Sequence, residues 1–170
     1  RILCYDIRDL GRQLLPVGML VVLDSIFNRI IRNRQQGRNT WIYIDEIYLL
    51  FQHEYSANFL FTLWKRVRKY RACCTGITQN VDDLLQSHTA RTMLANSEFL
   101  VMLNQAATDR TELARLLNIS DNQLSYITNV DSGRGLIKCG SAIVPFMDHF
   151  PKNNLYRLMS TKPSEADAAV

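Results

Sequence analysis

Apolar residues are spaced with two different periods along the first two thirds of the chain. Short apolar runs predict buried strands at residues 1–7, 40–44, 72–78 and 99–103. Between them, apolar positions recur at the spacing of one helix face, which predicts helices at residues 14–34, 56–70 and 88–96. Pro16 suits the first helix's opening turn, Gly37 its end, and Ser56 the N-cap of the second. Alternating strands and helices predict parallel βαβ units with helices on both faces of the sheet.

The last third predicts shorter elements. Asp109 with Glu112, and Ser120 with Gln123, have the spacing of a capping box, so each pair is expected to open a helix. Two apolar runs, residues 135–139 and 142–146, flank Gly140 and Ser141, which predicts a peripheral antiparallel hairpin. The tail is rich in Ala, Ser and acidic residues, and we expect residues 161–170 to be disordered.

The composition is ordinary for a soluble globular domain, with 47% hydrophobic and 21% charged residues. The longest apolar run, around residues 19–23, falls far short of the roughly 20 residues that a membrane span needs. The four cysteines lack metal-site spacing, so we expect reduced core cysteines of a cytosolic protein at positions 4, 73, 74 and 139. The three histidines are isolated and suggest no metal site or catalytic triad.

The net charge of +4 is mild, but the basic residues are unevenly distributed. One cluster lies within residues 29–38 and the other within residues 65–71. A basic cluster at the end of a helix is favoured by the helix dipole, and each cluster has this simple structural interpretation.

Residues 41–46 end an apolar strand with two acids, Asp45 and Glu46, which is the Walker B pattern. Ligands of a parallel sheet bind at the carboxyl ends of its strands. A carboxylate there can hold Mg²⁺ through water, and the next acid can orient or deprotonate an attacking water. The alternative is a strand that leaves the core through polar residues.

Two further features follow within about 35 residues of the acid pair. Gln79 comes after the next predicted strand, where an amide can sense a γ-phosphate or hold a water; Gln also ends strands in ordinary turns. The cluster at residues 65–71 could supply an arginine across a subunit boundary to a phosphoryl-transfer site, or it could be a solvated helix end. The order of acid pair, helix, basic cluster, strand and Gln favours a nucleotide-hydrolysing site.

The chain resembles the motor domain of conjugative-transfer ATPases of type IV secretion systems, within a wider class of hexameric DNA-pumping and protein-pumping ATPases. The resemblance extends over nearly the whole chain except the tail, and its matching segments are residues 41–46, 63–71, 75–85, 96–105 and 133–140. It implies an α/β fold, a partial RecA-like P-loop NTPase with a mostly parallel sheet flanked by helices. Residues 1–160 would be the C-terminal portion of that motor domain.

The resemblance also implies residue roles. Asp45 would be the Walker B aspartate that holds Mg²⁺ through water, and Glu46 the catalytic glutamate. Gln79 matches the glutamine sensor and, with Asp45, would contact the nucleotide. Arg68 is the expected arginine finger because it lies eleven residues before Gln79, as in related motors.

Arg66 and Arg71 are alternative fingers. The expected cofactors of the full-length protein are ATP and Mg²⁺, and the expected partners are the other subunits of a homo-hexamer, other secretion components and DNA. The resemblance places the protein in the cytoplasm, held at the inner face of the membrane through the secretion complex.

One family feature is missing. No Gly-x-x-x-x-Gly-Lys-Ser/Thr occurs in the 170 residues, and without this loop there is no nest of backbone N–H groups for phosphates. We therefore expect the chain to be part of a longer protein, and to bind nucleotide weakly and hydrolyse none by itself. The alternative functions are a non-enzymatic nucleic-acid-binding module or a scaffold of a secretion complex. The aromatic residues do not alternate with the basic ones as a stacking platform would require.

Overall fold

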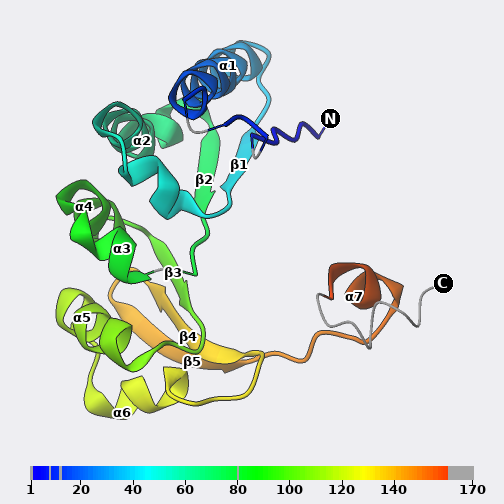
Figure 1. Ribbon diagram of the computed structural model, residues 1–170. Helices are drawn as coiled ribbons and strands as arrows, with labels where there is room; N and C mark the ends of the chain where they lie inside the picture. The colour runs from blue at the N-terminus through cyan, green and yellow to red at the C-terminus, as the bar shows by residue number, and fades with distance from the viewer. Residues whose placement is uncertain (1, 8, 12, 80, 161–170) are drawn as a thin grey trace. The chain divides into compact units, whose positions relative to one another are not determined.

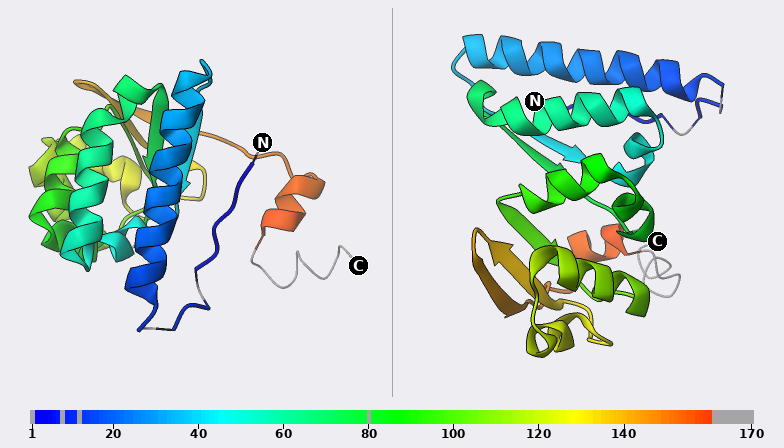
Figure 2. Two further views of the ribbon diagram at one scale, coloured as in Figure 1. Left: turned by 90° about the horizontal axis from the view of Figure 1, so that it is seen from above. Right: turned by 90° about the vertical axis from the view of Figure 1, so that its left-hand side faces the viewer.

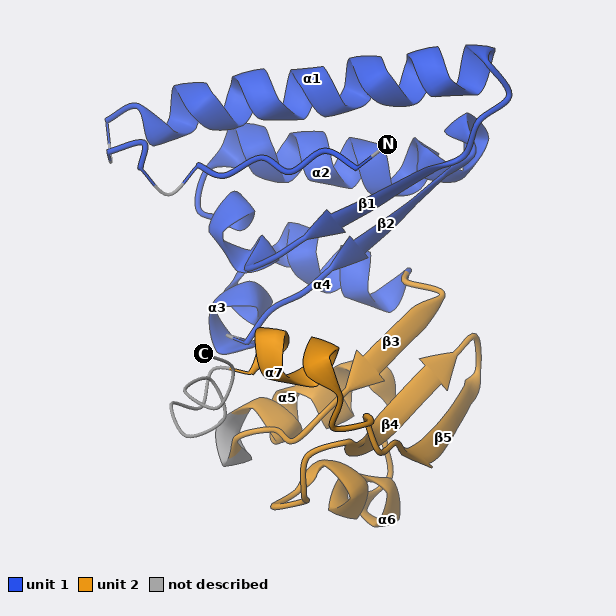
Figure 3. Ribbon diagram, turned by 90° about the vertical axis from the view of Figure 1, so that its right-hand side faces the viewer, with its two compact units in different colours: residues 1–96 blue, residues 97–170 orange. Residues whose placement is uncertain are grey.

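A computed structural model describes residues 2–7, 9–11, 13–79 and 81–160 (Figure 1). The chain divides into two compact units, residues 1–96 and residues 97–170, which are coloured separately in Figure 3. The predicted disordered tail, residues 161–170, lies outside the described residues.

The first unit contains one parallel pair of strands and the helices that surround it. Its elements are α1 (Leu15–Gln35), β1 (Thr40–Ile44), the 3-10 helix η1 (Ile47–Phe51), α2 (Glu54–Arg66), the 3-10 helix η2 (Val67–Tyr70), β2 (Ala72–Gly76), α3 (Val81–Gln86) and α4 (His88–Ala95). The strands pair in register from Thr40 opposite Ala72 to Ile44 opposite Gly76. This is the βαβ connection that the alternating pattern predicts.

Helices α1 and α2 run side by side along this strand pair (Figures 2 and 3). Ile30 of α1 and Leu63 of α2 are buried against Ile42 and Ala72 of the strands, so alternate strand residues face the helices. The residues between them face the other way, and Trp41 and Tyr43 are 65% and 68% exposed. The described helices of this unit therefore leave that face open, whereas the sequence predicted helices on both faces.

A second apolar cluster joins η1 to the helices around it. Its buried members come from α1, η1, α2, α3 and α4, and include Ile47, Leu50 and Leu60. Ser56 is 3% exposed, and its hydroxyl donates hydrogen bonds to the carbonyls of Leu50 and His53. The prediction that Ser56 caps α2 is wrong, because His53 is the N-cap and Ser56 lies inside the first turn.

The second unit is an antiparallel sheet with helices. Its elements are β3 (Phe99–Met102), α5 (Ala107–Leu117), α6 (Asp121–Leu124), the 3-10 helix η3 (Ser125–Ile127), β4 (Arg134–Cys139), β5 (Ala142–Met147) and α7 (Asn154–Met159). The predicted hairpin is confirmed as β4 and β5, and Gly140 takes a left-handed φ of 56° in its turn. β3 pairs antiparallel with β4, so the prediction of a further parallel strand is wrong.

Three local predictions have mixed outcomes. The capping box of Ser120 and Gln123 is confirmed at the start of α6. Ala106 is the N-cap of α5, so Asp109 lies within the helix rather than before it. Residues 2–7 form no strand, because no neighbouring strand pairs with them among the described residues.

Candidate active site

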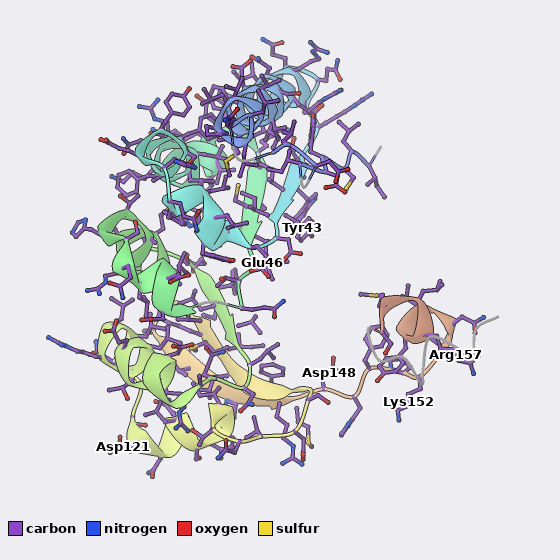
Figure 4. The ribbon with its side chains drawn as sticks, in the orientation of Figure 1. Tyr43, Glu46, Asp121, Asp148, Lys152 and Arg157 are labelled. Carbon is purple, nitrogen blue, oxygen red and sulfur yellow. The ribbon has the colours of Figure 1, made fainter. Side chains whose placement is uncertain are left out.

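Asp45 and Glu46 lie directly after β1, at the carboxyl edge of the strand pair. Two backbone hydrogen bonds continue the pairing past the strand ends: Ile77 N donates to Ile44 O over 2.8 Å, and Ile47 N donates to Ile77 O over 2.9 Å. The two acids therefore form a tight turn held against the chain that leaves β2. Figure 4 labels Glu46 at this end of β1.

The conformation of Glu46 is uncommon. Its φ of 47° lies in the left-handed region, which costs a side-chain-bearing residue about 1–3 kcal/mol. Its Oε2 atom is buried and has no hydrogen-bond partner within the described part of the chain. Asp45, in contrast, is exposed, and its Oδ1 accepts the backbone N–H of Glu46 at 3.0 Å. The turn thus presents an exposed carboxylate beside a half-buried one with an unused oxygen.

Gln79 belongs to the same edge. It lies three residues beyond the end of β2, and its side chain is exposed. α3 begins two residues later with Asp82 and Asp83 in its first turn, so this end of the unit is acidic. The backbone thus places Asp45, Glu46 and Gln79 at neighbouring strand ends.

Arg68 lies at the opposite end of the strands. It is exposed in η2, which precedes β2. With Arg71, Trp41 and Cys73 it helps to line a shallow groove of about 260 Å³ around the amino ends of β1 and β2. The length of β2, roughly 17 Å at 3.3 Å per residue, separates Arg68 from the acidic edge.

The two basic clusters of the sequence converge at this amino edge. The Arg34 guanidinium lies 5.4 Å from the centre of the Tyr70 ring, and Arg71 Nη1 donates to the carbonyl of Gly37 at 3.5 Å. Thr40 N also donates to Arg71 O over 3.1 Å, which ties η2 to the start of β1. Residues 29–41 and 62–76 contain no acid, so unit 1 has a basic end and an acidic end.

The cysteines are mostly not core residues. Cys4, Cys73 and Cys139 are exposed, so the prediction of buried cysteines is wrong for these three, and all four are free thiols. Cys74 faces the helices and is half-buried. Burial, with a smaller contribution from Cys73, raises the pKa of the Cys74 thiol to about 12.

The donor set at the acidic edge suits Mg²⁺ bound mainly through water. Mg²⁺ prefers oxygen ligands, retains several waters and is commonly held by one or two carboxylates. Asp45 offers an exposed carboxylate, and Glu46 an oxygen with no described partner. Within the described ranges, no group of three or more His, Cys, Asp or Glu side chains forms a fully protein-liganded metal site. The 170 residues contain no loop for the phosphates of a nucleotide.

Sequence reasoning missed two residues that hold the Glu46 turn. Ile47 is buried at 5% exposure and packs directly against Gly76, the last residue of β2. The only signal in the sequence is a glycine near the end of an apolar strand, which often marks a close approach. The left-handed conformation of Glu46 has no signal in the sequence.

The sequence that forms these elements matches a known family. The profile of the TraG P-loop domain matches residues 4–136, which is more than half of the chain. The chain belongs to the TraG P-loop domain family. The match extends from before α1 into β4, so it includes both ends of the parallel strand pair as well as β3.

Comparison with solved structures supports the fold of this TraG P-loop domain. The structure of VirB4 of Thermoanaerobacter pseudethanolicus matches with a TM-score of 0.74 and 24% sequence identity, and the match covers 88% of this chain. The match spans 41% of the VirB4 chain. The predicted RecA-like P-loop fold is therefore confirmed. No curated protein sequence gives a significant match. None of the described helices combines the length and apolar character needed to cross a membrane.

Proposed function

We propose that this TraG P-loop domain chain is part of an ATP-hydrolysing motor that powers conjugative DNA transfer or type IV secretion. The observation that carries the proposal is the turn at Asp45 and Glu46, beside the β2 end that leads to Gln79. The phosphate-binding loop would come from sequence outside these 170 residues. The secretion complex would hold the motor at the cytoplasmic face of the membrane.

The side chains at the acidic edge have distinct proposed roles. Asp45 is exposed and would hold Mg²⁺ through water. Glu46 would accept a proton from the attacking water through Oε2, which has no described hydrogen-bond partner and would have to become accessible to that water when nucleotide binds. Gln79 would contact the γ-phosphate at the end of the neighbouring strand and so sense whether it is present.

The separation of Arg68 from these residues supports a role across a subunit boundary. A side chain roughly 17 Å away along β2 cannot reach a phosphate at the acidic edge of its own copy. A head-to-tail contact between the basic end of one copy and the acidic end of the next would bring the two together. Repeated contacts of this kind close into a ring when the rotation between neighbouring copies is a whole fraction of a turn, as the proposed homo-hexamer requires.

Replacing Glu46 by Gln tests this function. In the longer polypeptide that includes a phosphate-binding loop, Glu46→Gln should reduce ATP hydrolysis by about 10²–10⁴-fold. ATP binding, measured with a fluorescent analogue, should stay intact. Glu98→Gln changes an exposed glutamate of the second unit and is the matched control, with full activity expected. Normal turnover by Glu46→Gln, or hydrolysis at ordinary rates by the 170-residue chain alone, would show the proposal to be wrong.

A non-enzymatic nucleic-acid-binding module is the second candidate. The groove at the basic end combines Arg68 and Arg71 with the exposed ring of Trp41, and such a surface can bind phosphates and stack a base. This candidate predicts salt-dependent binding of single-stranded DNA by the 170-residue chain, weakened by Trp41→Ala. It also predicts that Glu46→Gln has no effect on that binding.

A further inference from the structure

Gly76 meets the side chain that follows Glu46. A Cβ atom at position 76 would lie 2.5 Å from Cδ1 of Ile47 and 3.3 Å from its Cγ2, both closer than ordinary van der Waals contact. Ile47 is 5% exposed and belongs to the buried cluster with Leu50 and Leu60. The Cδ1 atom ends the side chain and can rotate away, but Cγ2 branches directly from Cβ, and the close packing of the buried cluster limits how far the side chain can turn.

The need for glycine at position 76 is one of space rather than conformation. The glycines with a left-handed φ in the described chain are Gly37, Gly133 and Gly140. Gly76 is part of the regular parallel ladder opposite Ile44, in a conformation that any residue adopts. An alanine would therefore be accepted by the backbone, and its methyl group would meet Ile47.

Ile47 is in turn tied to the Glu46 turn. Its N–H donates to Ile77 O at 2.9 Å, and Ile77 N–H donates to Ile44 O at 2.8 Å. These two bonds enclose Asp45 and Glu46 between fixed points on both strands. A shift of Ile47 away from β2 would lengthen the first bond and release the left-handed conformation of Glu46.

We propose that Gly76 and Ile47 are positioning residues that set the orientation of the Glu46 carboxylate. This inference rests on the proposed function, in which Glu46 is the general base. Neither residue would contact the nucleotide, and both would act through Glu46. The absent side chain at position 76 lets Ile47 pack against β2, and the Ile47–Ile77 hydrogen bond then fixes the turn.

If position 76 could accept a methyl group, Gly76→Ala would have the opposite effect on stability. Where the native conformation and space accept a methyl group, Gly→Ala stabilises a protein, because it restricts the unfolded chain. If the contact with Ile47 matters, Gly76→Ala should instead lower the melting temperature. Gly11→Ala is the matched control, since no atom lies within 4 Å of a Cβ there and its φ is not left-handed.

The kinetic test uses the longer polypeptide with its phosphate-binding loop. Gly76→Ala should lower kcat roughly tenfold to a hundredfold, as expected for a displacement of a catalytic group by about 1 Å, with little change in KM for ATP. Adding Ile47→Val removes the Cδ1 atom that the new methyl group meets, so the double variant should recover most of kcat. Ile47→Val alone is the parent against which the double variant is compared, and it should lower the melting temperature modestly because it removes one buried methyl group. Gly11→Ala should stay close to wild type.

A second readout does not depend on hydrolysis. In the 170-residue chain, hydrogen exchange at the amides of Ile47 and Ile77 should accelerate in Gly76→Ala and slow again when Ile47→Val is added. Unchanged exchange and kcat in Gly76→Ala would overturn the inference, as would a double variant that recovers neither. If Glu46→Gln keeps full turnover, the proposed function fails. If Glu46→Gln loses turnover and Gly76→Ala keeps it, only the positioning role is refuted.

Discussion

Mixing two inactive variants tests the proposed contact between Arg68 and a neighbouring subunit. In the longer polypeptide, Arg68→Ala removes the proposed arginine finger and keeps Glu46. Glu46→Gln removes the proposed general base and keeps Arg68. If Arg68 acts only across a boundary, an Arg68→Ala subunit can hydrolyse ATP when its neighbour is a Glu46→Gln subunit. The two defects then lie in different sites, and one complete site is formed.

The size of the recovery follows from the separation of the two ends. Because β2 places Arg68 roughly 17 Å from the acidic edge, no copy would complete its own site under this proposal. In a randomly mixed head-to-tail ring of equal parts, half the subunits retain Glu46 and half of their neighbours retain Arg68, so about one quarter of the sites are complete. Each variant alone should lose activity, by about 10³–10⁵-fold for the lost arginine and by about 10²–10⁴-fold for the lost glutamate.

Phosphate release, measured as the ratio of the two variants changes at constant total protein, is the appropriate assay. Activity should peak at equal parts near one quarter of wild type and vanish at both extremes. Arg115→Ala changes an exposed arginine of α5 and should leave the activity unchanged. The same titration with Arg66→Ala and Arg71→Ala decides which arginine is the finger. A mixture no more active than its two parents would refute the role across the boundary.

Two further predictions concern unit 1. Ser56→Ala should lower the free energy of unfolding, measured by urea denaturation, by about 1–3 kcal/mol, because the buried carbonyl of Leu50 loses its donor. The control Ser25→Ala changes an exposed serine and should alter the free energy of unfolding by less than about 0.5 kcal/mol. Equal effects of the two substitutions would contradict this reasoning. With a thiol reagent at pH 8, the exposed Cys73 should react and Cys74 should not, since the raised pKa of Cys74 keeps its thiol protonated until the pH approaches about 12. Mass spectrometry of the labelled peptides measures both reactions. Rapid labelling of Cys74 in the folded chain would show the reasoning to be wrong.

Local signals in the sequence predicted the helices better than the sheets. The apolar period, Pro16 and Gly37 fixed α1 to within about one residue, because helix ends depend on neighbouring residues. β3 was assigned to a parallel sheet because a short apolar run looks the same in either kind of ladder. Its partner β4 lies more than 30 residues away, and only tertiary packing selects it.

Capping signals failed where packing outweighed them. Ser56 is a residue type that favours the N-cap, but it lies inside the first turn of α2, and its hydroxyl donates to the carbonyls of Leu50 and His53. The sequence separates Ser56 from Leu50 by six residues, and the 3-10 turn of η1 brings them together. The capping box at Ser120 held because both of its partners lie within the same helical turn.

At the candidate site, the sequence predicted which residues share an edge but not how one of them is held. Asp45 and Gln79 follow neighbouring parallel strands, so chain order alone brings them to one end. The left-handed Glu46 contradicts local preference, and its buried Oε2 lacks a described partner. A structure keeps two such unfavourable features in one residue only when surrounding contacts hold it there. The contact of Ile47 with Gly76 and the hydrogen bonds through Ile77 are such contacts. These features support the proposal that Glu46 is the general base, and the Glu46→Gln variant separates it from the alternative of a strand that only leaves the core.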